Sequence, residues 1–219
     1  MRIKWKELNR GIVLAVVLAA GLTVSVIIQD AKFEKNIPDI EKRMEELGQE
    51  LAESSIGSGE AVRRKQRAFI MNEYVDRKPK VEDMMATTAK GNMLFMANQP
   101  SKENGEVKSG EFKSKRIDVY KAGPNGATVE LEYEMKVDMI GTPEIMQFGE
   151  MLQTEWYIED VIGEKDVTKK LTAEHSVVVN ATYTVTLEKS DGVWKIATAG
   201  GFSDLSIEGK ENGGGMGVG

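Results

Sequence analysis

The run GIVLAVVLAAGLTVSVII, residues 11–28, contains no charged side chain, and no other segment of the chain is comparably apolar. An α-helix rises about 1.5 Å per residue, so these residues span roughly 27 Å, which is close to the thickness of the hydrocarbon core of a bilayer. The run therefore predicts a transmembrane helix, and it places the rest of the chain at a membrane surface.

The charges that flank this helix predict its orientation. Residues 1–10 carry four basic side chains and one acidic one, whereas the charges at residues 30–35 are balanced. The positive-inside rule then predicts a single-pass cell-membrane protein with a cytoplasmic tail (1–10), a signal anchor (11–28) and an extracytoplasmic C-terminal part.

Two alternatives to a signal anchor stay open. In a cleaved signal peptide, Ala19, Ala20 and Gly21 would form the cleavage site, but cleavage would leave the apolar segment 22–28 at the new N-terminus. The other alternative is a buried helix of a soluble protein. The apolar remnant that cleavage would leave makes a retained anchor the favoured prediction.

Composition excludes several classes of function. The chain has a net charge of −6 and no cysteine. Because the first ten residues are basic, the exported part is more acidic still, which argues against nucleic acid as a partner. The absence of cysteine excludes disulfides, thiolate nucleophiles and thiolate metal ligands.

Six apolar residues after the anchor are spaced by four, three, four, three and four positions, as in a coiled-coil heptad. They are Phe33, Ile37, Ile40, Met44, Leu47 and Leu51. Residues 29–56 are therefore either a stalk that self-associates or an amphipathic helix that lies on its own domain. The pattern lasts under three heptads and Gly48 weakens it, so the second interpretation is favoured.

Helical patterns continue over residues 60–75 and 81–96. The first contains the basic cluster Arg63, Arg64, Lys65 and Arg67, which we expect to be a solvated helix face, with contact to anionic lipid as the alternative. The second is rich in methionine, which fills irregular gaps in protein cores. Residues 98–110 are polar and predict a loop.

The periodicity then changes from 3.6 to 2, which predicts strands. The predicted strands are 116–121, 129–139, 154–161, 177–187 and 193–199. Gly123–Gly126 and Ser190–Gly192 have the sequences of hairpin turns, and Thr142–Glu144 predicts the start of a short helix.

Each long strand has one apolar face, so the predicted sheet is antiparallel and needs a helical cover on one side only. We expect an α+β fold in which helices pack on a curved antiparallel sheet, forming a cone-like domain over residues 57–205. Residues 206–219 end in GGGMGVG and predict a disordered tail.

The segment YTVTLEKSDGVWKI, residues 183–196, is similar to the last hairpin of many domains of the nuclear-transport-factor-two-like (cystatin-like) superfamily. The order of elements over residues 60–203 also resembles that superfamily, which implies a cone-shaped domain. With its single anchor, the layout resembles the inner-membrane scaffold subunits of type IV secretion and conjugation systems. That resemblance implies an assembly platform in the bacterial envelope, by analogy of fold.

Few side chains predict chemistry. His175 is the one histidine and lies in phase with the apolar Val177; without a second histidine or a cysteine, we expect it to be packed rather than to act as a general base. Glu130, Glu132 and Glu134 share the polar strand face, which predicts solvated carboxylates. No ligand set for zinc, calcium or magnesium is visible. The sequence thus predicts no catalytic residue, no metal, no cofactor and no enzyme.

The favoured prediction is a non-enzymatic, membrane-anchored scaffold that binds protein partners or itself. The alternative is a pocket protein of the same fold that binds, or less readily transforms, a small apolar ligand. The residues expected to line such a pocket are Phe69, Trp156, His175 and Trp194.

Overall fold

The computed structural model describes residues 10–76, 88–99, 105–155, 172, 174–200 and 204–211. The chain divides into two compact units, Met1–Asp39 and Ile40–Gly219. Trp156, most of the predicted strand 154–161 and residues 81–87 of the second predicted helix lie outside the described residues.

The first unit contains helix α1 (Arg10–Glu34). Its segment Leu14–Glu34 has a mean hydropathy of 2.0 and none of its apolar window is buried. A helix of this length and composition fits a membrane anchor or a signal sequence. α1 ends in a turn at Lys35 and Asn36, where the backbone N–H of Asn36 donates to the carbonyl of Phe33 at 2.8 Å.

Helix α2 (Ile37–Ser54) directs its apolar stripe into the second unit. Ile40, Met44, Leu47 and Leu51 are completely buried there, so residues 40–54 of the predicted stalk belong to the domain. This arrangement corresponds to the amphipathic helix that lies on its own domain. Self-association stays a prediction, but in this structure these four side chains are already enclosed by their own chain. Phe33 and Ile37 are half-buried.

Helices α3 (Gly59–Glu73) and α4 (Ala89–Ala97) follow. The position of α3 confirms the predicted helix at 60–75. α4 begins after Thr88, whose hydroxyl oxygen accepts a hydrogen bond from the backbone N–H of Gly91 at 3.1 Å. Such an N-cap satisfies an N–H that has no partner within the helix.

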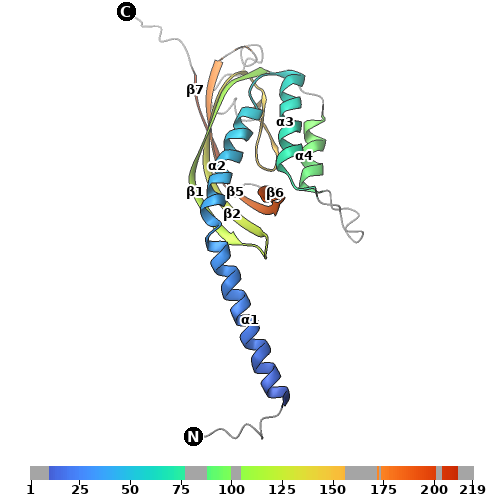
Figure 1. The fold of residues 1–219 in the computed structure, drawn as a ribbon. Coiled ribbons are helices and arrows are strands. Elements are labelled where there is room, and N and C mark those ends of the chain that lie inside the picture. The colour runs from blue at the N-terminus through green and yellow to red at the C-terminus, as the bar shows by residue number, and fades with distance from the viewer. Residues whose placement is uncertain are drawn as a thin grey trace, which may run out of the picture. The chain divides into compact units, whose positions relative to one another are not determined.

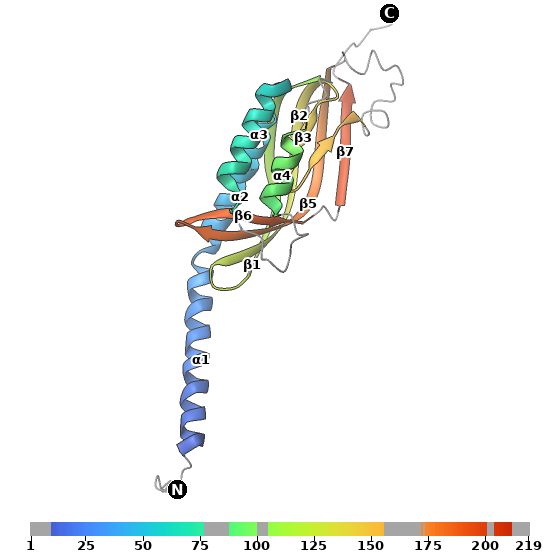
Figure 2. The same cartoon turned by 90° about the vertical axis from the view of Figure 1, so that its right-hand side faces the viewer.

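The second unit is built on an antiparallel sheet of β1 (Gly105–Lys121), β2 (Gly126–Gly141), β5 (Glu174–Ser190), β6 (Val193–Ala199) and β7 (Asp204–Glu211). The strand order is β1-β2-β5-β6, and β7 pairs with the first half of β5. α2, α3 and α4 lie on one side of this curved sheet (Figures 1 and 2). The architecture is α+β, with helices on one side of a curved antiparallel sheet, as predicted.

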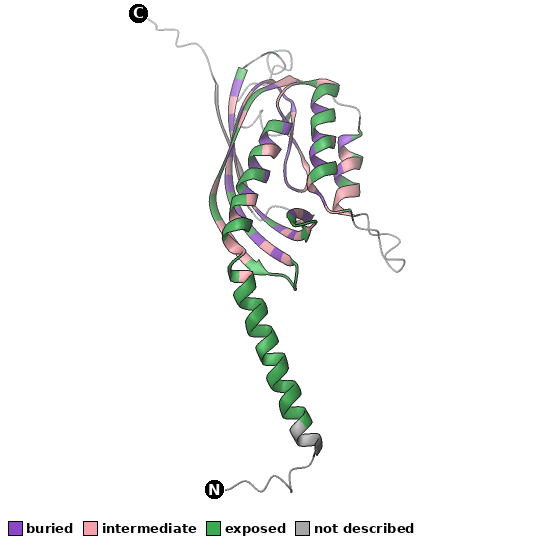
Figure 3. Cartoon of the chain, in the orientation of Figure 1, coloured by how far each residue is buried: buried purple, intermediate pink, exposed green. Residues whose placement is uncertain are grey.

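The burial of the strands follows their alternation. In β2 and β5 the residues of one face are buried, and those of the other face are half-buried or exposed (Figure 3). Glu130 and Glu132 are exposed and Glu134 is half-buried on the outer face, which confirms that they do not enter the core. The predicted turn between β5 and β6 is also confirmed, since Asp191 and Gly192 have φ angles of 52° and 84°, as a tight hairpin requires.

Three local predictions are wrong. Glu144 begins strand β3 (Glu144–Met146), which pairs with β4 (Met151–Gln153), and not a helix. Pairing between these strands, together with a hydrogen bond from the backbone N–H of Met146 to the Ser55 hydroxyl (3.1 Å), outweighs the local helix-start signal. The predicted loop 98–110 is a strand from Gly105 onward, because β2 offers a partner along its whole length. Residues 206–211, expected in the disordered tail, form most of β7.

The glycine in α2 allows the helix to approach the sheet closely. A Cβ atom placed on Gly48 would lie 2.2–2.4 Å from three atoms of the Phe112 ring on β1. Any larger residue would therefore have to displace a ring that is itself packed in the core. The glycine that weakens the heptad pattern is the contact point between α2 and the sheet.

We expect Gly48→Ala to destabilise the domain by about 1–3 kcal/mol, because overpacking a core forces side chains and backbone to shift. Urea denaturation of the full chain in detergent, followed by tryptophan fluorescence, measures the change. Gln49→Ala is the matched control, since Gln49 is exposed on the same helix. Equal stability of Gly48→Ala and the control would contradict the close contact.

Candidate functional site

Aromatic side chains occupy the interior between the sheet and its helical cover. Phe112, Tyr133 and Tyr183 come from β1, β2 and β5, and Phe148 comes from the turn between β3 and β4. Tyr133 and Tyr183 stack with ring centroids 6.0 Å apart, and the ring of Phe148 meets that of Tyr133 edge to face at the same distance. These contacts form one continuous aromatic cluster.

The turn at residues 147–150 supplies polar partners to the tyrosines. The hydroxyl of Tyr133 donates to the side-chain oxygen of Gln147, and the hydroxyl of Tyr183 donates to Oε1 of Glu150 at 2.5 Å. The turn is closed by a hydrogen bond from the N–H of Gln147 to the carbonyl of Glu150 at 2.9 Å. Because buried hydroxyls need partners, this turn and the tyrosines stabilise each other.

Glu150 stands at the boundary between this interior and solvent. Glu150 is half-buried, whereas Tyr133 and Tyr183 are almost completely buried. Within the part of the chain that the structure describes, its second carboxylate oxygen has no hydrogen-bond partner. Glu150 can therefore accept a further hydrogen bond from outside.

The phenols of this site stay protonated over the physiological pH range. Burial raises the pKa of Tyr133 and of Tyr183 well above the ordinary value of a phenol, and the negative charge of Glu150 raises both further. Burial alone raises the pKa of Tyr74, whose hydroxyl donates to the carbonyl of Phe148 at 2.8 Å. All three act as hydrogen-bond donors and not as bases.

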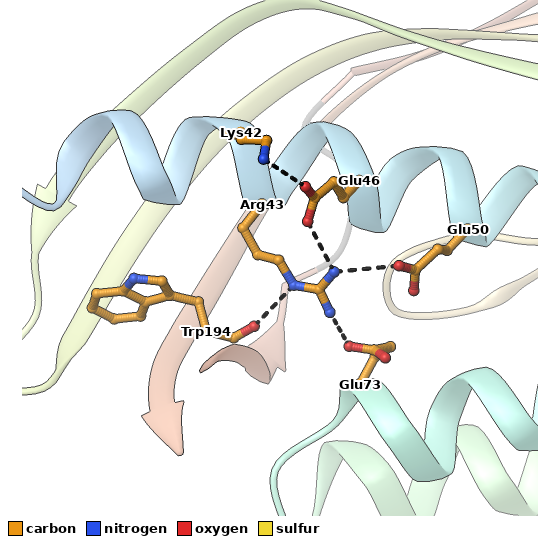
Figure 4. Close-up of polar contacts among 6 residues, drawn as sticks. All are labelled: Lys42, Arg43, Glu46, Glu50, Glu73 and Trp194. Atoms are coloured by element: carbon orange, nitrogen blue, oxygen red, sulfur yellow. Dashed lines mark hydrogen bonds and ion pairs between the residues drawn. The ribbon is translucent and has the colours of Figure 1, made fainter. Parts of the chain in front are cut away.

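A second polar cluster lies where α2, α3 and β6 meet (Figure 4). The guanidinium of Arg43 donates to Glu46 at 3.4 Å, to Glu50 at 3.3 Å, to Glu73 and to the carbonyl of Trp194 at 3.3 Å. One cation thus holds the end of α3 and the start of β6 against α2. Burial, and next the charge of Glu73, raise the pKa of Glu50, although Arg43 opposes this shift.

A third polar group is the ion pair between the buried Arg63 and the half-buried Glu144. Arg63 also donates to the side-chain oxygen of Gln66 at 3.2 Å. A cavity of about 20 Å³ adjoins this pair, which is room for about one water molecule. Such a pair joins α3 to β3, and its burial makes it costly to break. The cluster fits a structural role.

The structure separates the residues predicted to line a pocket. Trp194 on β6 pairs with Lys189 of β5. Lys189 lies fourteen positions after His175 on the same strand, which is about 46 Å along the strand at 3.3 Å per residue. Phe69 packs edge to face on Tyr74, with centroids 6.3 Å apart. Phe69, His175 and Trp194 are all buried, but His175 and Trp194 lie too far apart to line one pocket.

His175 lies on the inward face of β5, opposite Met139 of β2. It is buried, and neither ring nitrogen has a hydrogen-bond partner among the described residues. No group of three His, Asp or Glu side chains comes together within the described ranges in a way that could hold a metal ion.

Sequence patterns do not distinguish Tyr133, Tyr183, Gln147 or Glu150 as site residues. The two tyrosines stand at apolar positions of strongly alternating strands, so they count there as core residues. The available signal was that tyrosine brings a hydroxyl into the core, and a buried hydroxyl needs a partner. The partner could not be identified because the turn at 147–150 was not predicted.

The comparisons with known proteins give solved structures only. A scan against protein-family models found no match, and a search of the curated proteins found none either. One similar structure is hexachlorocyclohexane dehydrochlorinase (LinA) type 2, with 12% identity, a TM-score of 0.38 and coverage of 78% of this chain and 92% of that one. Another is the LinA-type3 enzyme of Novosphingobium barchaimii LL02, with 14% identity, the same TM-score, and coverage of 78% and 93%.

Both similar structures are enzymes, which contradicts the sequence-based prediction that this chain is not one. At this identity and TM-score the likeness carries no reaction or substrate over to this chain. The findings also do not show the predicted likeness to scaffold subunits of type IV secretion and conjugation systems.

We expect Glu50→Gln to raise the melting temperature at neutral pH. The folded-state pKa of Glu50 is raised, so protonation favours the folded state, and the ionised carboxylate reduces stability above this pKa. Removing the charge relieves that loss, while Gln can still accept the hydrogen bond from Arg43. The gain should shrink as the pH falls through the pKa of Glu50, because the wild-type side chain is then neutral too.

Thermal unfolding of both proteins between pH 3 and pH 8 measures this difference. Gln49→Ala on the same helix serves as the control for a change without loss of charge. A Glu50→Gln melting temperature that stays below that of wild type at neutral pH would show that the ion pair with Arg43 outweighs burial.

Proposed function

We propose that the protein is a membrane-anchored binding protein that takes a small, largely apolar ligand beside Tyr183 and Glu150. The observation that carries this proposal is the pair itself: a buried phenol donates to a half-buried carboxylate at 2.5 Å, and the other carboxylate oxygen has no partner among the described residues. A carboxylate in this position recognises a hydroxyl or ammonium group on a ligand.

The surroundings of the pair favour an apolar ligand body. Phe148 and Tyr133 lie against Tyr183, with centroid distances of 6.4 and 6.0 Å. Phe148 and Tyr133 are completely buried, so they are the apolar background of the pair. Sites for small ligands combine apolar surroundings with a small number of polar groups that fix orientation. A molecule with an apolar body and one hydrogen-bond donor matches both features.

We further propose that α1 is retained as an anchor and holds this domain on the extracytoplasmic side of the cell membrane. The length and hydropathy of α1 support spanning, and the basic residues before it support a cytoplasmic N-terminus. The domain would then bind its ligands at or near the membrane surface, where apolar molecules concentrate.

Thermal unfolding of the full chain in detergent tests the binding proposal. The panel consists of apolar molecules that each carry one amine, one hydroxyl or neither group. A ligand present at 100 times its dissociation constant stabilises a protein by about 2.7 kcal/mol, which for a domain of this size is a rise of about 5–10 °C. We expect some amine or hydroxyl members to give such a rise and their unsubstituted analogues not to.

Glu150→Gln and Tyr183→Phe should abolish most of this rise. Glu46→Gln is the matched control, because Glu46 is an exposed carboxylate on α2 that belongs to the Arg43 cluster. A rise that is equal in wild type and in both site variants would place the ligand elsewhere, and a panel without effect would contradict the proposal.

A further inference from the structure

α3 and α4 are neighbouring antiparallel helices that expose two large apolar side chains. The amine of Lys90 donates to the carbonyl of Met71 at 3.2 Å, and the guanidinium of Arg67 donates to the carbonyl of Ala97 at 3.3 Å. Met71 is 54% exposed and Phe95 is 67% exposed. We call the outward side of these two helices the α3–α4 face.

The charge of the α3–α4 face is opposite to that of the whole chain. The two helices carry five basic and two acidic residues, whereas the chain has a net charge of −6. Arg63 and Glu73 are used internally, in the ion pairs with Glu144 and Arg43. Arg67 pairs with Glu60, the other acidic residue of the two helices. Arg64, Lys65 and Lys90 are left as the net positive charge of the face.

The α3–α4 face begins close to the point where the chain enters the domain. Glu73, the last residue of α3, pairs with Arg43, which is the fourth residue of the second unit. Between Ile28, the last residue of the apolar run, and Ile40 the chain is helical except for a turn at Lys35 and Asn36. These twelve steps reach at most about 25 Å, since helical residues rise about 1.5 Å and extended ones about 3.5 Å.

We propose that the α3–α4 face is a second membrane contact, which binds the anionic headgroups of the same bilayer that α1 spans. Arg64, Lys65 and Lys90 contact lipid phosphates, and Met71 and Phe95 enter the boundary between headgroups and acyl chains. The short connection supports a lipid partner, because it keeps the membrane at a high effective concentration for this face. The proposal rests on α1 as an anchor and is independent of ligand binding at Glu150.

Fluorescence of a single label in reconstituted full-length protein tests the contact. The chain has no cysteine, so Asn92→Cys gives one labelling site on the exposed side of α4, and Thr184→Cys gives a control site on the outer face of β5. Both carry an environment-sensitive dye, in vesicles of phosphatidylcholine alone or with phosphatidylglycerol. Spin-labelled lipids report whether the dye lies close to the bilayer. Flotation of the vesicles first confirms that α1 holds the protein in the membrane.

We expect the label at position 92 to shift to the blue and to be quenched in the anionic vesicles, and the label at position 184 to do neither. Arg64→Glu with Phe95→Ser should abolish both effects, since each basic contact with an anionic surface strengthens binding about fivefold. The matched control is Lys113→Glu with Tyr120→Ser, which makes the same changes at exposed positions on β1 and should retain both effects.

Three results would overturn the proposal. One is a label at position 92 that stays unquenched in anionic vesicles although the protein floats with them. Another is equal quenching in neutral and anionic vesicles, which would make the charge irrelevant. The third is burial of the label only in native membranes that contain other proteins, which would assign the α3–α4 face to a protein partner.

Discussion

The contact between Gly48 and the ring of Phe112 fixes how closely α2 lies against the sheet, and the other interior contacts depend on it. With α2 at this distance, Ile40, Met44, Leu47 and Leu51 reach the core and are completely buried. Each such burial contributes about 2 kcal/mol relative to exposure. Phe112 in turn begins the aromatic cluster that extends through Tyr133 to Tyr183, and so α2 indirectly positions the phenol that holds Glu150.

Two arginines hold the helices where the apolar contacts place them. Arg43 joins α2 to α3 and β6, and Arg63 joins α3 to β3. Arg43 donates to three carboxylates and one carbonyl, whereas Arg63 donates to one carboxylate and one amide oxygen. Burial and the charge of Glu73 raise the pKa of Glu50 in spite of its contact with Arg43. The planar guanidinium suits this role because it can donate to several acceptors in different directions at once. The domain thus connects its elements without disulfides.

The fold could be predicted where a pattern was long, and the site could not. The alternation over residues 129–139 and 177–187 is long enough that only a strand with one buried face fits, and β2 and β5 confirm it. For Ile40 to Leu51 the choice between stalk and domain helix was open, because periods of 3.5 and 3.6 differ little over so few turns. Glu144 carried a local helix-start signal that pairing with β4 outweighed. Glu150 depends on contact between a turn and two distant strands, and no local pattern reports such a contact.

With α1 as the proposed membrane anchor, the joint between α1 and α2 also determines how the domain could be released. Proteases cleave extended backbone, and a helix must unwind locally before it fits their active sites. Between Ile28 and the first buried residue, Ile40, only Lys35 and Asn36 lie outside a helix, and the N–H and side-chain amide of Asn36 are bonded to the carbonyls of Phe33 and Lys32. Shedding of an intact domain therefore has one short point of attack, and cleavage any further along would cut into the core helix itself.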